Sequence, residues 1–298
     1  MNYDSCTLCP RMCHADRINS HGFCGAGATV KVARAALHPW EEPCISGTRG
    51  SGTVFFSGCT LKCIFCQNHE LSHENFGKEV SIKRLAEIFL ELQSQGAHNI
   101  NLVTATHYLP SIKDALDLVR PELHIPVVYN CGGYERPETL REFSDYIDIY
   151  LPDLKYYDNT LSERYSSARD YFQIASTAIE EMIRLTGGLI WNPDHPSLLQ
   201  KGVIIRHMVL PGAKNDSIRL LHWMKDTLPD GQFMVSLMSQ YTPFYKSHLY
   251  PEINRRITSY EYQKVLDTAI DLGLVHGYMQ EKSSAKEEYT PPFDFSGV

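Results

Sequence analysis

The chain has 298 residues, 43% of them hydrophobic, so it can bury one large core, and we expect one main domain. Its formal net charge is -7 and its basic residues form no block, which argues against nucleic acid or an anionic membrane as the main partner. The start lacks the basic and apolar regions of a signal peptide, and no apolar run has the length of a membrane helix. We therefore expect a soluble cytoplasmic protein that acts on a small molecule or on another protein.

The first group of cysteines consists of Cys6, Cys9, Cys13 and Cys24. In a reducing compartment, grouped cysteines are better explained as metal ligands than as disulfides. Four thiolates make a closed site, which suits tetrahedral zinc. They also suit a second iron–sulfur cluster that relays electrons or fastens the segment. The sequence leaves both metals open, and we expect residues 1–46 to form a small metal-binding segment before the main domain at 47–281.

A short buried strand is expected at 53–57, where β-branched and aromatic residues are grouped. The loop after it carries the second group, Cys59, Cys63 and Cys66, in a C-x3-C-x2-C spacing. Three thiolates can bind three irons of a 4Fe-4S cluster and leave the fourth iron open for a ligand. A structural zinc site would need a fourth ligand, and no cysteine follows in the next sixty residues. The spacing therefore favours a cluster with one open iron.

Helical and strand patterns alternate after this loop. Ser81 is a suitable N-cap for a helix over 82–95, which Gly96 would end. Strands are expected at 100–103, 125–129, 147–151, 203–210, 233–238 and 275–278, with helical segments after 111, 137, 160, 217 and 259. This alternation predicts six parallel β-α units, too few for a closed eight-fold barrel. The residues from 282 to 298 are charged and contain prolines, and they are expected to form a surface tail.

Polar residues stand where four of these strands end. Because the carboxyl ends of parallel strands converge on one mouth of a barrel, these residues are candidates for binding a cofactor. The candidates of this kind are Thr104, Thr106, His107, Asn130, Asp153, Lys155 and Arg206. Their hydroxyl, amide and charged groups suit a zwitterionic ligand that carries a ribose.

Several of these motifs together resemble one enzyme family. The cysteine motif with an aromatic residue before its last cysteine looks like the signature of the radical S-adenosylmethionine (radical SAM) enzymes. Gln67-Asn68, the Thr-x-Thr-His segment, the Asp-Leu-Lys of 153–155 and the Arg-His-x-Val-Leu-Pro-Gly of 206–212 resemble the pyruvate formate-lyase activating enzyme-like branch. The N-terminal Cys-x-Leu-Cys-Pro-Arg-x-Cys is similar to that of a poorly characterised subgroup of this branch. The likeness covers most of residues 6–280, and its motifs specify the cofactor chemistry more closely than the substrate.

The resemblance implies an open partial (β/α)6 barrel with a small cysteine-rich extension at its N-terminus. It implies that Cys59, Cys63 and Cys66 hold a 4Fe-4S cluster that cleaves SAM to a 5'-deoxyadenosyl radical, and that Phe65 lies beside the adenine. It implies an electron donor such as flavodoxin or ferredoxin. Asp153 and Lys155 match an Asp-x-Lys pair near the SAM carboxylate and an associated cation, although the two could equally form an ordinary ion pair.

One departure from the family pattern concerns the methionine amino group of SAM. Activating enzymes carry Gly-Gly-Glu at the end of the second parallel strand, where this chain has Thr104-Ala105-Thr106-His107. The threonine hydroxyls or His107 are the candidates for that role. The N-terminal cysteines also differ from the ferredoxin-type insertion of many activating enzymes.

Three functions compete on this sequence. The first is the activation of a glycyl radical enzyme by hydrogen abstraction from its backbone. The second is a radical SAM reaction on a small molecule or a peptide. The third, a non-catalytic iron–sulfur sensor, would leave the open iron and the polar barrel mouth without a use.

Overall fold

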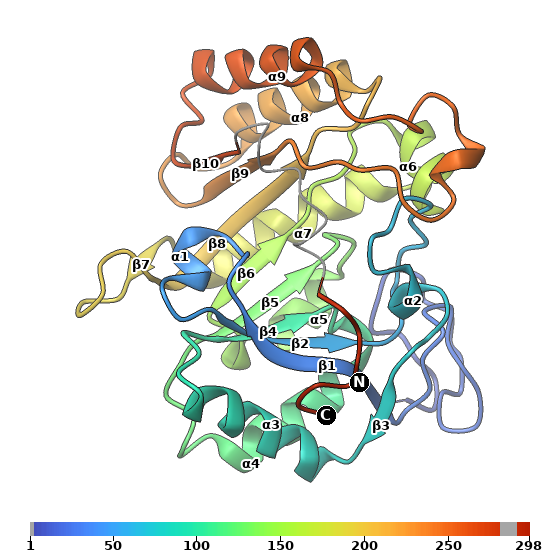
Figure 1. Ribbon diagram of the computed structural model, residues 1–298, viewed down its shortest axis with the longest axis vertical. Helices are drawn as coiled ribbons and strands as arrows, with labels where there is room; N and C mark the ends of the chain where they lie inside the picture. Colours follow the sequence, from blue (N-terminus) through green and yellow to red (C-terminus); the bar gives the residue numbers. More distant parts are fainter. Residues whose placement is uncertain (1–2, 281–290) are drawn as a thin grey trace.

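The computed structural model describes residues 3–280 and 291–298 of the chain (Figure 1). The strands are β1 (Val30–His38), β2 (Ser51–Phe56), β3 (Lys78–Val80), β4 (Ile100–Val103), β5 (Val127–Cys131), β6 (Ile149–Pro152), β7 (Ile190–Trp191), β8 (Leu199–Met208), β9 (Met234–Met238) and β10 (Gly277–Met279). The α-helices are α1 (Pro43–Ser46), α2 (His69–Ser72), α3 (Ile82–Ser94), α4 (Leu109–Val119), α5 (Pro137–Glu142), α6 (Asn159–Ser166), α7 (Tyr171–Thr186), α8 (Lys214–Thr227) and α9 (Ser259–Asp271). Short 3₁₀ helices lie at Thr106–Tyr108, Ser144–Tyr146 and Ser247–Leu249.

The strands form one sheet in the order β10-β9-β8-β6-β5-β4-β2-β1-β3. Every neighbouring pair from β2 to β10 is parallel, while β1 is antiparallel to both β2 and β3. Six β-α units therefore lead from β2 to β10, and the sheet does not close on itself. The expected open partial (β/α)6 barrel is confirmed.

One strand that the sequence patterns did not predict precedes the barrel strands. The strand expected at 53–57 is β2, and β1 precedes it, because the chain first crosses the sheet in the opposite direction. β1 lies within the predicted metal-binding segment of 1–46 but is hydrogen-bonded to the barrel strand β2. The boundary predicted after residue 46 stays a prediction.

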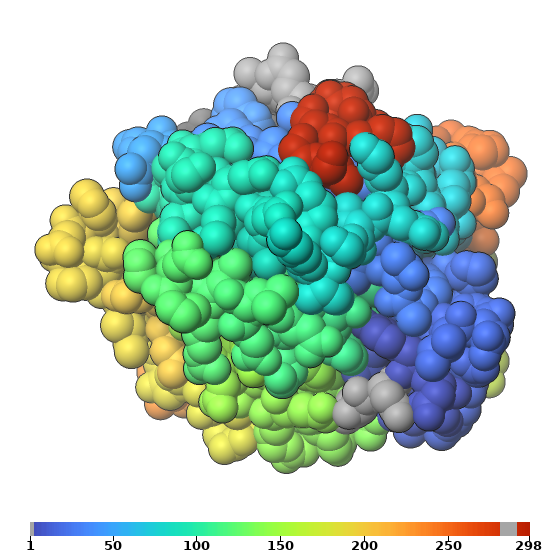
Figure 2. Space-filling model, turned by 90° about the horizontal axis from the view of Figure 1, so that it is seen from below, coloured from blue at the N-terminus to red at the C-terminus, as the bar shows by residue number. Residues whose placement is uncertain are grey.

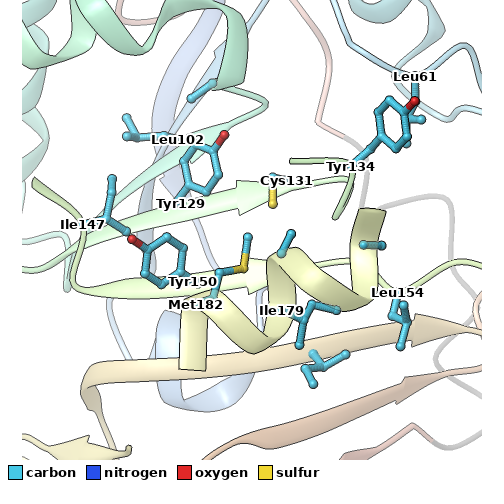
Figure 3. Packing of buried hydrophobic residues seen from close by; sticks show 14 of the residues in the cluster. Leu61, Leu102, Tyr129, Cys131, Tyr134, Ile147, Tyr150, Leu154, Ile179 and Met182 are labelled. Atoms are coloured by element: carbon cyan, nitrogen blue, oxygen red, sulfur yellow. The ribbon is translucent and has the colours of Figure 1, made fainter. Parts of the chain in front are cut away.

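Helices cover the outer face of the curved sheet. Tyr150 on β6 packs there with Ile179 and Met182 of α7, beside Tyr129 of β5 (Figure 3). The 82–95 prediction corresponds to α3, whose first turn is capped by Ser81 accepting a hydrogen bond from the amide of Arg84 at 3.1 Å. The alternation of helices and strands could be expected because each helix carries apolar residues on the face that packs against the sheet.

The inner face of the sheet is covered at one end by α1. Cys44 and Ile45 of this short helix pack in one cluster with Ile149 and Met234, the first residues of β6 and β9, and with Ile204, which pairs with Met234. In Figure 1, α1 accordingly lies beside β6 and β8. The space left inside the barrel therefore lies toward the carboxyl ends of the strands.

Both ends of the described chain pack on the barrel. The N-terminal residues gather at one side of the face seen in Figure 2, and the C-terminal residues lie at its upper edge. The predicted tail lies partly outside the described residues, but its last residues add to β1, where the amide of Phe295 donates to the carbonyl of Ala33 at 3.0 Å. The ring of Phe295 stacks on that of Phe76. Within the described part of the chain, none of the helices combines the length and apolarity that crossing a membrane requires.

Candidate functional site

A cavity of about 780 Å³ lies inside the open barrel. This volume is within the usual range of ligand sites. Its wall brings together side chains from the cluster loop, from the ends of the parallel strands and from the segment between β1 and α1. These include Cys63, Phe65, Cys66, Asn130, Asp153, Lys155 and Arg206 from the sequence-based candidates, and Glu41, Glu42, Ser236, Met238, Gln240 and Tyr278, which were not predicted.

The three thiols of the cluster loop lie close to one another, with Cys63 buried and Cys59 and Cys66 partly buried. Burial, and then the neighbouring Cys63 and Cys66, raise the pKa of Cys59 to about 12. Burial and then Cys63 raise the pKa of Cys66 to about 11. Each sulfur also has a polar group beside it. The amide of Leu61 donates to Cys59 Sγ at 3.4 Å, and the hydroxyl of Ser72 donates to Cys66 Sγ at 3.3 Å.

The three thiols and the hydrogen-bond donors beside them have the chemistry that an iron–sulfur cluster requires. Soft thiolate ligands select such clusters, and hydrogen bonds to the sulfurs are among the levers that tune them. A bound metal would reverse the preference for protonated thiols, because it stabilises thiolates strongly. As the described side chains stand, no three His, Cys, Asp or Glu residues have the geometry of a metal site. The three sulfurs would therefore have to turn toward a shared cluster.

Asp153 joins two cations at the wall of the cavity. One carboxylate oxygen accepts from Arg206 Nε at 2.9 Å, and the other accepts from Lys155 Nζ at 2.5 Å. Burial alone would raise the pKa of Asp153, but Arg206 and Lys155 together hold it below its usual value. Burial also dominates the raised pKa of the Cys63 thiol, which the nearby Lys155 counteracts. The ion pair therefore lies directly beside the cluster loop.

Arg206 extends this network across the barrel. Its Nη2 donates to Asn130 Oδ1 at 2.6 Å, and its Nη1 forms an ion pair with Glu41 Oε2 at 3.3 Å. Arg206 thus connects the ends of β5, β6 and β8 with the segment before α1. The sequence-based candidates Asn130, Asp153, Lys155 and Arg206 form one hydrogen-bonded group.

The candidates after β4 lie elsewhere. Thr104, Thr106 and His107 are not among the residues that line the cavity. Thr106 is buried and donates its hydroxyl to Glu135 at 2.9 Å. His107 is buried with its Nε2 2.7 Å from the carbonyl of Ser57, and burial lowers its pKa to about 3, so the ring is neutral. Their role in binding a cofactor stays a prediction.

Phe65 lies at the cavity wall, 6% exposed, with its ring edge-on to that of Tyr241. Its place one residue before Cys66 puts an apolar surface next to the cluster loop. Such a surface can pack against a flat heterocycle. This position agrees with the expectation that Phe65 lies beside an adenine, which stays a prediction.

The four N-terminal cysteines also lie near one another. Cys6, Cys9 and Cys24 are buried, and Cys13 is exposed. Burial, and then Cys24, Glu135 and Cys6, raise the pKa of Cys9 to about 12. A side-chain carbon added at Gly22 would lie 3.3 Å from Cys24 Sγ and 3.6 Å from Cys13 Sγ, so these two sulfurs face the same glycine. That these four cysteines bind a metal together stays a prediction.

The N-terminal group is attached to the cluster loop. The amide of Cys59 donates to the carbonyl of Cys24 at 3.1 Å. Gly58 permits this approach, since its φ is +91° and an added side-chain carbon would lie 2.9 Å from that carbonyl oxygen. The buried Arg17 donates to Cys6 Sγ at 3.6 Å and to the carbonyl of His107 at 2.6 Å. The first residue of the cluster motif is therefore positioned partly by the N-terminal segment.

The sequence analysis missed Glu41 and Glu42. They follow an antiparallel strand, so the rule that points to the carboxyl ends of parallel strands does not reach them. Two adjacent carboxylates between a strand and a proline were the available signal. Ser236 lies on β9 and lines the cavity. The end of this parallel strand, Met238-Ser239-Gln240, was not among the strand ends selected from the sequence.

Among solved structures, the fold is similar to that of SuiB from Streptococcus suis, crystallised with the precursor peptide SuiA. The TM-score is 0.50 at 15% identity, over 75% of this chain and 46% of that one. It is also similar to HydG, a maturase of the FeFe-hydrogenase, with a TM-score of 0.51 at 13% identity over 74% of this chain and 48% of that one. The chain thus spans about half the length of these two proteins. At these identities the likeness concerns the fold alone.

Comparisons of sequence identify the family. The uncharacterized protein MJ0674 of Methanocaldococcus jannaschii is 30% identical over 277 residues, which cover 90% of this chain and 75% of that protein. The family model of the radical SAM superfamily matches residues 53–221, which include the cluster loop and the ends of β4, β5, β6 and β8. This family implies a 4Fe-4S cluster and SAM as cofactors. The chain belongs to the radical SAM superfamily of enzymes.

Proposed function

We propose that this protein cleaves SAM reductively and uses the resulting 5'-deoxyadenosyl radical to abstract hydrogen from a substrate. The observation that carries the proposal is that Cys63 and Cys66 share the wall of one cavity with the partly buried network of Asp153, Lys155 and Arg206. A cluster ligand set and a charged site for a zwitterion therefore face the same space.

Each residue has a distinct role in this proposal. Cys59, Cys63 and Cys66 hold the cluster, and the chemistry that the cluster and SAM supply together is a radical able to break a C–H bond. Lys155 attracts the SAM carboxylate, and Asp153 keeps Lys155 and Arg206 in place. Phe65 packs against the adenine, and the buried wall excludes water from the radical. A reductant such as flavodoxin or ferredoxin supplies the electron.

The test is an anaerobic assay of SAM cleavage. Purified protein with its cluster reconstituted is incubated with SAM and dithionite, and 5'-deoxyadenosine is measured by chromatography. We expect slow formation of 5'-deoxyadenosine even without a substrate. With deuterated fractions of cell extract, deuterium should enter 5'-deoxyadenosine in the fraction that holds the substrate. A protein that forms a cluster but never produces 5'-deoxyadenosine would be a sensor and not an enzyme.

Two classes of substrate remain within this proposal. The activating-enzyme resemblance favours a glycyl radical enzyme, whose backbone glycine would lose a hydrogen. A small molecule or a peptide is favoured by the cavity, whose volume suits a ligand and whose wall includes the acidic groups Glu41 and Glu42. Electron paramagnetic resonance of the reacted fraction distinguishes them, because only the first class leaves a stable radical on a protein.

We also propose that Cys6, Cys9, Cys13 and Cys24 hold a metal of their own, zinc or a second iron–sulfur cluster. The buried Arg17 supports this proposal, because its charge beside Cys6 offsets part of the negative charge of four thiolates. A closed thiolate site contributes directly to folding. It would hold Cys24 where its carbonyl accepts from the amide of Cys59.

The double variant Cys9→Ala, Cys13→Ala should bind less metal than the wild type and should unfold at lower denaturant concentration, because two of four ligands are lost. Metal analysis for zinc, iron and sulfide checks the first point and identifies the metal. Circular dichroism in urea checks the second. Cys44→Ala, which removes a buried thiol outside both groups, is the matched control. Equal metal content in the double variant and the control would contradict this proposal.

A further inference from the structure

One buried carboxylate oxygen at the cavity has no partner. Glu42 is 8% exposed and lines the cavity, and its Oε2 has no hydrogen-bond partner among the described residues. Burial raises the pKa of Glu42, and the charge of Arg206, its own backbone amide and Ser236 oppose this rise. A buried acceptor without a donor is costly, so one with access to a cavity is a place where a ligand can supply the donor.

The described carboxylates at the cavity wall outnumber the described cations by one. Among the residues that the structure describes, Asp153, Glu41 and Glu42 are the carboxylates at the cavity wall, and Lys155 and Arg206 are the cations there. Lys155 is bound to Asp153, and Arg206 is bound to Asp153, Glu41 and Asn130. His38 also lines the cavity, but burial lowers its pKa to about 4, so it adds no charge near neutral pH. The wall therefore has room for one more positive charge.

Glu42 is not among the residues that the proposed SAM site uses. Lys155 acts on Cys63, Asp153 binds Lys155 and Arg206, and Arg206 binds Glu41. Glu42 is held by the turn into α1, where the amides of Ile45 and Ser46 donate to its carbonyl at 2.8 and 2.9 Å. The charge of Arg206 acts on its carboxyl group, but Oε2 accepts no hydrogen bond among the described residues. This oxygen is left for another ligand.

We propose that Glu42 binds a protonated amino group of the substrate in the cavity. This inference rests on the proposed function, in which SAM binds beside Lys155. An ammonium group matches the site because it supplies both the missing donor and the missing positive charge. The substrate class is then a primary amine, such as an amino acid, a polyamine or a lysine side chain.

Propylamine, protonated at neutral pH, is the probe, and 1-propanol is its neutral counterpart of similar size. Binding of each to the cluster-loaded protein with SAM bound is measured by saturation-transfer NMR. We expect propylamine to bind and 1-propanol to bind about tenfold more weakly or not at all. Glu42→Gln should weaken propylamine binding about tenfold or more, since a charge-assisted hydrogen bond is lost. Glu180→Gln, on the exposed side of α7, is the matched control and should bind as the wild type does.

The other outcomes have definite meanings. Equal binding of propylamine to wild type and Glu42→Gln, or no binding to either, would overturn the inference. Competition between propylamine and SAM would also overturn it, because the missing donor would then belong to SAM. A wild type that does not bind SAM contradicts the proposed function instead, while propylamine binding is still measured in the SAM-free protein. If Glu42→Gln is poorly folded, Glu42→Asp withdraws the carboxylate by one carbon and should show the same loss.

Discussion

The triple variant Cys59→Ala, Cys63→Ala, Cys66→Ala should contain none of the oxygen-sensitive iron of the wild type and should produce no 5'-deoxyadenosine. The reason is that the three thiols are the only ligands that the described cluster loop offers, and they already lie together in the fold. The reduced wild type should give an electron paramagnetic resonance signal that shifts when SAM is added. The triple variant should give no such signal.

The control for this experiment is Cys131→Ala. Cys131 is a buried thiol on β5 that belongs to neither cysteine group (Figure 3). Its variant should keep the signal and its response to SAM. Iron bound to the N-terminal cysteines would remain in the triple variant, so the SAM-dependent shift is the measurement that counts. A shift that survived in the triple variant would place the SAM-binding cluster elsewhere and refute the central assignment.

The repeated β-α units could be predicted because each strand and helix carries its own local signal. The helix α3 illustrates this point, since Ser81 caps it and Leu85, Ile88, Phe89 and Leu92 form its buried face. The open barrel then follows from the number of units. β1 has no such signal, because its sequence VKVARAALH is rich in alanine and it pairs in the antiparallel direction before the repeats begin.

The candidate site was predictable only where a side chain points into the barrel. Asn130 lies on β5, Asp153 directly follows β6, and Arg206 lies on β8. All three side chains line the cavity. Thr106 and His107 follow β4 just as closely, but a 3₁₀ helix begins at Thr106 and turns both side chains into the protein. Position after a strand does not reveal that turn. Glu42 was out of reach for another reason, because its place depends on α1 folding inside the barrel.

The variant Asp153→Ala should bind SAM about ten to a hundred times more weakly than the wild type while keeping its cluster. Asp153 holds Lys155 at 2.5 Å and Arg206 at 2.9 Å, so its removal leaves two partly buried cations without their shared partner. They would turn toward other acceptors, and Lys155 would no longer be fixed beside the cluster loop. The expected loss corresponds to one charge-assisted contact of roughly 1.5 to 3 kcal/mol. Titration calorimetry gives the affinity, and iron analysis of the same sample gives the cluster content.

Breaking a buried ion pair can also unfold a protein, at a cost of about 3 to 5 kcal/mol, so a second variant is needed. Asp153→Asn keeps the shape and one acceptor oxygen, and it should show an intermediate loss of SAM affinity with a normal iron content. Asp226→Asn, on the exposed face of α8, controls for the loss of one negative charge. Unchanged SAM affinity in both Asp153 variants would mean that the ion pair is structural only. Lost iron in Asp153→Asn would mean that Asp153 supports the cluster loop, because Lys155 then no longer lies beside Cys63.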